Sequence, residues 1–143
     1  MFSLVFPGQG SQTIGMGKDF FENYDLVKDL FIQANDSLGI SLSKIILEGP
    51  KDELDLTVNT QPAIFLISYS IFQVMKKEFN MDLDNAKYFA GHSLGEYSAL
   101  CAAKYLSFSD TIKILKTRGE AMQNAVPKGC LLYTSPSPRD SIA

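Results

Sequence analysis

Two short apolar runs along the chain have the length of buried strands. The first spans residues 2–6 and ends at Pro7-Gly8, and the second is Tyr88-Phe89-Ala90, which a glycine follows. Runs of this length, bounded by turn residues, are typical of strands in a parallel sheet. Helical patterns separate them, which favours an α/β fold. Because two strands are too few for a complete parallel sheet, we predict an incomplete parallel sheet with flanking helices.

Apolar positions at helical spacing predict the helices around these strands. Gly39 is the expected stop of the first helix. Asn59 and Pro62 predict the start of a largely buried helix, as a capping residue and a proline in the first turn. Ser109 is the expected cap of the last helix. The expected helices span residues 26–38, 42–47, 52–56, 59–79, 94–104 and 110–124.

Composition and charge exclude several classes of protein. The chain has 143 residues, of which 45% are hydrophobic and 20% charged, as in an ordinary globular domain. Its net charge of −3 is too small to indicate nucleic acid or a membrane surface as a partner. No signal peptide is visible, and no apolar run approaches the roughly 20 residues of a membrane helix. We therefore expect a cytoplasmic protein. The two cysteines fit neither a disulfide framework nor a metal site.

The strongest chemical signal is the G-x-S-x-G pattern of a nucleophile elbow. A strand is predicted before it and a helix after it, as the pattern requires. So tight a turn strains the serine and exposes its hydroxyl, and side chains at the flanking glycines would clash. The N-terminus of the following helix would stabilise negative charge on an acyl oxygen. Ser93 is therefore the predicted nucleophile, with a plain turn and a capping serine as the alternative. The pattern reads Gly91-His92-Ser93-Leu94-Gly95.

Two further features support this site. A loop rich in glycine and glutamine, residues 7–12, follows the first strand. It leaves the same edge of the sheet as the elbow, where ligands bind in parallel sheets, and it can bring a backbone N–H close to Ser93. It lacks the Gly-Lys-Ser/Thr ending of a phosphate-binding loop. Arg118 lies 118 − 93 = 25 residues beyond Ser93. A solvated or dipole-matched charge is the alternative interpretation of Arg118.

Four separated motifs resemble a known family. Over about residues 1–129 the chain is similar to the malonyl-CoA:acyl-carrier-protein transacylases of fatty-acid synthesis and to the related acyltransferase domains of polyketide synthases. The resemblance implies the front part of an α/β-hydrolase-like acyltransferase large subdomain. The motifs are Pro7-Gly8-Gln9-Gly10-Ser11-Gln12, Thr60-Gln61-Pro62-Ala63, Gly91-His92-Ser93-Leu94-Gly95-Glu96-Tyr97-Ser98-Ala99, and Arg118-Gly119 with Met122-Gln123.

The resemblance also implies a reaction and its partners. Ser93 would take a malonyl group from malonyl-CoA as an ester, and the phosphopantetheine thiol of acyl carrier protein would then receive that group. No cofactor is implied. Lys104, Lys113 and Lys116 are candidate contacts for the carrier protein, although solvated lysines are the simpler interpretation. These residues do not indicate whether the acyl group is malonyl or methylmalonyl.

Roles for the other site residues follow from the same resemblance. The backbone N–H groups of Gln9 and Leu94 would form the oxyanion hole. Arg118 would hold the free carboxylate of malonate, since a planar guanidinium can bind both oxygens. His92 and Gln61 match residues that line the family's site.

Two expectations concern the catalytic base and the last residues. His92 is the single histidine of the chain, and a side chain adjacent to Ser93 on a sharp turn diverges from it, which makes His92 a poor base. In the family the base comes from a later segment, so we expect a truncated fragment that is poorly stable and nearly inactive. Residues 130–143 depart from the family pattern, and their Ser-Pro-Ser-Pro stretch suits neither a helix nor a central strand. We predict a disordered, non-family tail there.

Two alternatives to the transacylase stay open. A serine esterase of the α/β-hydrolase type would share the elbow, but Arg118 and the loop at residues 7–12 are not expected in it. The second alternative is an inert fragment, or a module that only binds acyl-CoA or the carrier protein. Neither the inert fragment nor the binding module would form an ester on Ser93.

Overall fold

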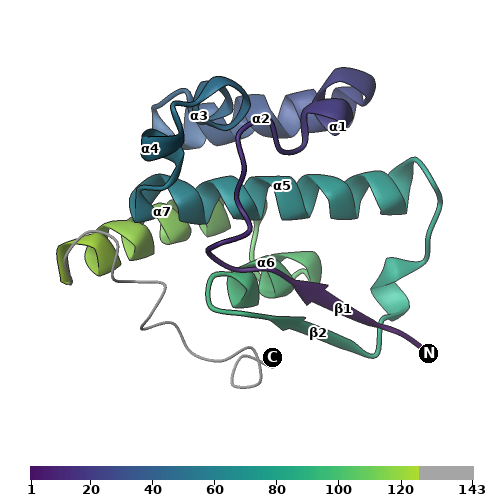
Figure 1. Ribbon diagram of the computed structural model, residues 1–143. Coiled ribbons are helices and arrows are strands. Elements are labelled where there is room, and N and C mark those ends of the chain that lie inside the picture. Colours follow the sequence, from purple (N-terminus) through teal and green to yellow (C-terminus); the bar gives the residue numbers. More distant parts are fainter. Residues whose placement is uncertain (126–143) are drawn as a thin grey trace.

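The computed structural model describes residues 1–125, which form a two-stranded sheet and a set of packed helices (Figure 1). Residues 130–143, predicted to be a non-family tail, lie outside the described residues. The elements in chain order are β1 Ser3–Phe6, α1 Lys18–Asn23, α2 Asp25–Leu38, α3 Leu42–Glu48, α4 Lys51–Leu54, α5 Thr57–Lys77, the 3-10 helix η1 Leu83–Asn85, β2 Tyr88–Gly91, α6 Gly95–Ala102 and α7 Phe108–Ala125.

The sheet is parallel, as the sequence predicts. β1 pairs with β2 in a register that runs from Ser3 opposite Tyr88 to Phe6 opposite Gly91. Both strands therefore end at the same edge, where the glycine-rich loop leaves β1 and the elbow leaves β2. α6 begins at this edge and packs against both strands. The strand pairing thus brings two segments more than 80 residues apart in sequence to one place.

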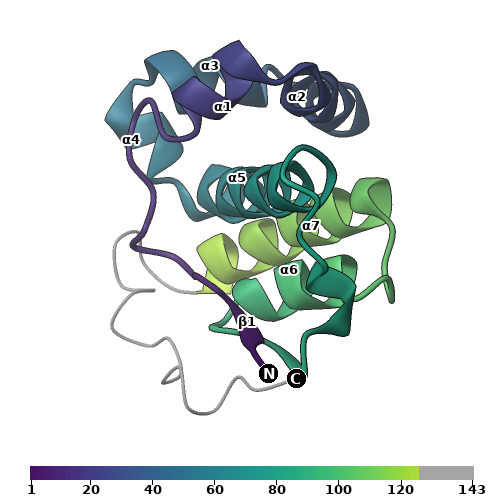
Figure 2. The same cartoon turned by 90° about the vertical axis from the view of Figure 1, so that its right-hand side faces the viewer.

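The long helix α5 forms the centre of the molecule. Figure 2 shows it between a layer made of α1–α4 and a layer made of α6, α7 and the sheet. Because α5 is apolar on most of its circumference, it can be covered on both sides, and its predicted burial is confirmed. No helix within residues 1–125 combines the length and the apolar character needed to span a membrane. Buried side chains of this core include Phe31, Leu42, Ile46, Phe65, Leu66, Ile112 and Leu115.

The start of α5 differs from the prediction. The helix begins at Thr57, so Pro62 lies inside it and is buried. The Asn59 side chain does not cap the helix but donates a hydrogen bond to the Glu53 carbonyl, at 2.9 Å. The Thr57 N–H instead donates to Oε1 of Gln123 on α7, at 2.9 Å. The predicted start of the helix was wrong because the partner of its first N–H lies 66 residues away in sequence, where a local pattern cannot indicate it.

Smaller differences concern the cap of α7 and two short helices. Ser107, and not Ser109, caps α7, since its Oγ accepts a hydrogen bond from the Asp110 N–H at 3.1 Å. The Ser109 hydroxyl instead lies 3.2 Å from the Ser37 hydroxyl of α2. α1 and η1 were not predicted because helices this short contain too few turns to show a periodic pattern.

Candidate active site

Ser93 occupies a strained turn between β2 and α6. Its φ of 56° lies in the left-handed region, which is unusual for a residue other than glycine. A Cβ atom at Gly91 would lie 2.0 Å from the carbonyl carbon and oxygen of Gly95. A Cβ atom at Gly95 would lie 2.4 Å from the Phe6 carbonyl oxygen. The predicted strain at the serine and the steric need for both glycines are therefore confirmed.

The exposure of Ser93 differs from the expectation. The residue is only 5% exposed, whereas the elbow pattern predicts an exposed hydroxyl. The reason is in part the side chain of Arg118, whose Nη2 donates a hydrogen bond to Ser93 Oγ at 3.1 Å and so lies against the hydroxyl. Ser93, the predicted nucleophile, thus lies at the carboxyl end of β2 with a cation against its hydroxyl.

Arg118 is held in place by three contacts. Besides Ser93, its Nη1 donates to Oε1 of Gln61 at 2.7 Å, and its guanidinium carbon lies 5.6 Å from the centroid of the Tyr97 ring. Nε2 of Gln61 in turn lies 3.1 Å from Sδ of Met122. The structure therefore brings together Ser93, Arg118 and Gln61, which the sequence placed on three separate helices or turns.

Tyr97 was not assigned a role from the sequence. It lies in the first turn of α6, close behind the elbow in sequence. Its place directly after the elbow was the available signal. The Tyr97 ring helps to hold the Arg118 guanidinium in place, because the face of an aromatic ring carries negative potential and attracts a cation.

The glycine-rich loop lies against the elbow. A Cβ atom at Gly8 would come within 2.6 Å of the His92 carbonyl oxygen. The Gln9 side chain donates from Nε2 to Oγ1 of Thr57 at 3.2 Å, which ties the loop to the first turn of α5. Within residues 1–125, neither the Gln9 N–H nor the Leu94 N–H has an assigned hydrogen-bond acceptor.

His92 packs on the loop side of the elbow. It is half-buried, and its ring carbon Cδ2 would lie 3.1 Å from a Cβ atom at Gly8. Its Nδ1 is buried and has no hydrogen-bond partner among the described residues. The structure places His92 beside the site but shows no contact from its ring to the Ser93 hydroxyl. Its role as a lining residue stays a prediction.

Other ionisable groups lie apart from the site. Burial raises the pKa of the Cys101 thiol to about 11, so this buried cysteine stays protonated at neutral pH. Lys104 pairs with Asp84 at 3.1 Å, while Lys113 and Lys116 lie on α7. No group of three side chains able to hold a metal ion occurs in the described part of the chain.

Comparison with protein families matches residues 3–136 to the family described as acyl transferase domain. The chain belongs to this acyl transferase family. Among its relatives, the malonyl CoA-acyl carrier protein transacylase of Haemophilus influenzae is 48% identical over 128 residues, which make up 90% of this chain and 40% of that protein. The transacylase of Escherichia coli K12 is 41% identical over the same shares. The acyl transferase chain thus spans about 40% of the length of the curated relatives it matches.

Solved structures agree with the acyl transferase assignment. The acyl-carrier-protein S-malonyltransferase from Bartonella henselae superposes with a TM-score of 0.83 at 48% identity, over 88% of this chain and 40% of that one. A malonyl-transacylase solved in complex with its type II polyketide synthase acyl-carrier protein gives a TM-score of 0.82 at 41% identity, over 88% of this chain and 40% of that chain. The resemblance predicted from the four motifs and the predicted α/β fold are both confirmed.

Proposed function

We propose that the protein containing these residues transfers a malonyl group from CoA to the phosphopantetheine thiol of acyl carrier protein. The observation that carries this proposal is the 3.1 Å hydrogen bond from Arg118 Nη2 to Ser93 Oγ. A malonyl group has its free carboxylate one methylene away from the carbonyl that reacts. A guanidinium beside the nucleophile can bind that carboxylate while the hydroxyl faces the carbonyl.

The reaction proceeds in two steps through a seryl ester. In the first step, Ser93 Oγ attacks the thioester carbon, the C–S bond breaks, and CoA leaves as a thiol with the proton that the hydroxyl gives up. In the second step, the carrier-protein thiol attacks the ester carbonyl and the proton returns to Ser93 Oγ. The N–H groups of Gln9 and Leu94 donate to the carbonyl oxygen when it carries negative charge.

The remaining residues orient the acyl group. Gln61 and Tyr97 hold the guanidinium of Arg118, and we assign His92 to the lining of the site and not to proton transfer. Acyl transfer of this kind uses a side-chain nucleophile and backbone donors, so the proposal includes no cofactor. Malonyl-CoA and acyl carrier protein are its substrates, and a cytoplasmic location remains part of the same proposal.

Mass spectrometry of the intact protein tests this function. The protein encoded by the complete gene is incubated with malonyl-CoA, and we expect a mass increase of one malonyl group on Ser93 that is lost in Ser93→Ala. No ester on Ser93 would instead support an inert or purely binding protein.

A second measurement separates a transacylase from an esterase. Arg118→Ala should lower kcat/KM for malonyl-CoA by about 10- to 100-fold, as expected for a charged hydrogen bond, and barely change the value for acetyl-CoA. Lys18→Ala, which removes an exposed cation from α1, is the control. Unchanged malonyl preference in Arg118→Ala would favour the esterase.

A further inference from the structure

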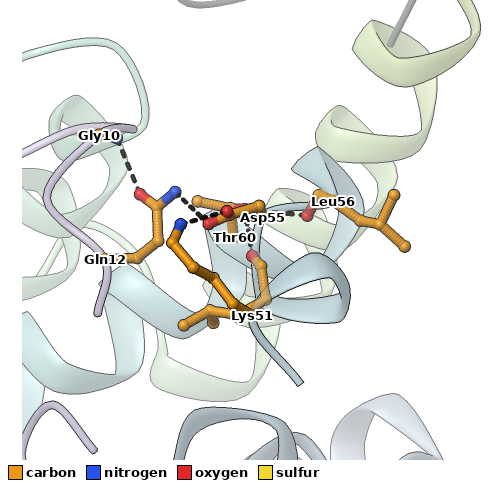
Figure 3. Close-up of polar contacts among 7 residues, drawn as sticks. Gly10, Gln12, Lys51, Asp55, Leu56 and Thr60 are labelled. Carbon is orange, nitrogen blue, oxygen red and sulfur yellow. Dashed lines mark hydrogen bonds and ion pairs between the residues drawn. The ribbon is translucent and has the colours of Figure 1, made fainter. Parts of the chain in front are cut away.

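Gln12 connects the glycine-rich loop to the end of α4 (Figure 3). Its Oε1 accepts a hydrogen bond from the Gly10 N–H at 2.8 Å, and its Nε2 donates to Oδ1 of Asp55 at 2.9 Å. The other carboxylate oxygen of Asp55 pairs with Lys51. One side chain therefore links the backbone of the loop to a carboxylate on another element.

This link acts next to Gln9, whose N–H is one of the two proposed oxyanion donors. Gly10 follows Gln9 directly and has a φ of 109°, a conformation that residues with side chains rarely adopt. On the other side of Gln9, Gly8 lies against the His92 carbonyl. Gln9 thus lies between Gly8, which packs closely against the elbow, and the Gln9–Gly10 peptide, whose N–H is hydrogen-bonded to Gln12.

The carboxylate of Asp55 determines which way the Gln12 amide faces. An ionised carboxylate only accepts hydrogen bonds, so it selects the NH₂ end of the amide and leaves the oxygen to face Gly10. Hydrogen bonds from Lys51 and then from Gln12 lower the pKa of Asp55, which keeps the carboxylate ionised at neutral pH. A neutral partner able both to donate and to accept would not enforce this orientation.

We propose that Asp55 is a positioning residue of the oxyanion site: through Gln12 it holds the Gly10 amide and thereby aims the Gln9 N–H at the acyl oxygen. This inference rests on the proposed function. Asp55 itself touches no reacting atom, and its side chain is 36% exposed, so the expected effect is smaller than the loss of an oxyanion donor.

The first test compares variants at Asp55 in the protein encoded by the complete gene. Asp55→Ala should lower kcat about 10-fold at nearly constant KM for malonyl-CoA, since misplaced catalytic groups affect turnover strongly. Asp55→Asn keeps an oxygen that accepts from Gln12 and should stay within about 3-fold of the unmutated enzyme. Asp25→Ala, which removes an exposed carboxylate paired with Lys28 on α2, is the matched control and should change neither parameter.

The second test reverses the direction of the hydrogen bond. Gln12→Glu places two carboxylates face to face and removes the donor, so it should reduce kcat more than Asp55→Ala does. Adding Asp55→Asn to Gln12→Glu supplies an amide that donates to the new carboxylate, whose other oxygen still accepts from Gly10. We expect the double variant to recover most of the lost kcat.

The outcomes distinguish the two proposals. An unmutated protein that forms no malonyl ester on Ser93 overturns the proposed function, and the positioning role with it. An unmutated protein that forms the ester while Asp55→Ala keeps full kcat per folded molecule overturns the positioning role alone. The positioning role is also overturned if Asp55→Ala and Gln12→Glu only lower the melting temperature, or if the double variant recovers nothing.

Discussion

Gly119 of α7 packs directly against the backbone of Thr57 on α5. A Cβ atom at Gly119 would lie 2.8 Å from the Thr57 carbonyl oxygen and 2.8 Å from Cα of Val58. The absent side chain lets the two helices approach closely, and the hydrogen bond between Thr57 and Gln123 joins them four residues further along α7. The position of Arg118 beside Ser93 therefore depends on the small size of its neighbour in sequence.

Replacing Gly119 by alanine should destabilise the protein, which is the opposite of the usual effect of Gly→Ala in a helix. In an exposed helix, Gly→Ala stabilises by about 1 kcal/mol. Here the new methyl group meets backbone atoms, so we expect Gly119→Ala to lower the free energy of unfolding by about 1–3 kcal/mol. Urea denaturation measures the change, with Thr117→Ala on the exposed side of α7 as a control that should be nearly neutral. A Gly119→Ala protein more stable than the parent would show that α7 does not need this contact.

The elbow should tolerate no side chain at Gly91. Its built Cβ atom comes within 2.0 Å of Gly95 backbone atoms, which cannot move without displacing α6. We expect Gly91→Ala to lower the free energy of unfolding by about 3 kcal/mol or more. A thermal melt of this variant should then show no cooperative transition above ordinary temperatures. Gly39→Ala is the comparison, because Gly39 has a φ of 67° with nothing within 4 Å of its Cβ position. The free energy of unfolding of Gly39→Ala should fall by only roughly 1–2 kcal/mol, the cost of alanine in a left-handed conformation. Equal losses in the two variants would contradict the steric explanation.

The N-terminal cap of α7 provides a test of local structure. Ser107→Ala removes the acceptor of the Asp110 N–H and should lower the free energy of unfolding by about 1 kcal/mol. Ser109→Ala removes only a hydroxyl–hydroxyl contact with Ser37 and should cost less. Chemical denaturation of the two variants side by side measures both losses, and a larger loss for Ser109→Ala would restore the cap predicted from the sequence.

The buried thiol of Cys101 predicts a dependence on alkaline pH. Because burial raises its pKa to about 11, the folded state binds this proton more tightly than the unfolded state does. The stabilising contribution is full below the ordinary thiol pKa and is lost as pH rises toward 11. The free energy of unfolding should therefore fall less steeply with rising alkaline pH in Cys101→Ala than in the parent protein.

Alkylation gives an independent measure of the same thiol. In a Cys130→Ser background, iodoacetamide at pH 8 should modify Cys101 slowly in the folded protein and rapidly in urea, since the thiolate is the reactive form. Equal rates in the two conditions would mean that the thiol is accessible and ionised in the folded state.

Several predictions from the sequence stay predictions. They include the roles of all the candidate site residues: Ser93, Gln9, Leu94, Arg118, His92 and Gln61. The division at residue 129, the low turnover of the 143-residue chain and its poor stability are likewise untested. By contrast, the α/β fold, the parallel pairing of the strands and the strained serine follow directly from local patterns that the structure confirms.

The sequence by itself determined the elbow, which depends on neighbouring residues, and the family, which depends on four short motifs in order along the chain. Two glycines, a serine, a strand before them and a helix after them are enough to specify a tight turn by steric exclusion. Only the tertiary structure decided what surrounds the Ser93 hydroxyl. Tyr97, Gln61 and Arg118 meet there because α5, α6 and α7 pack closely, and such contacts depend on volumes and distances between segments that are remote in sequence.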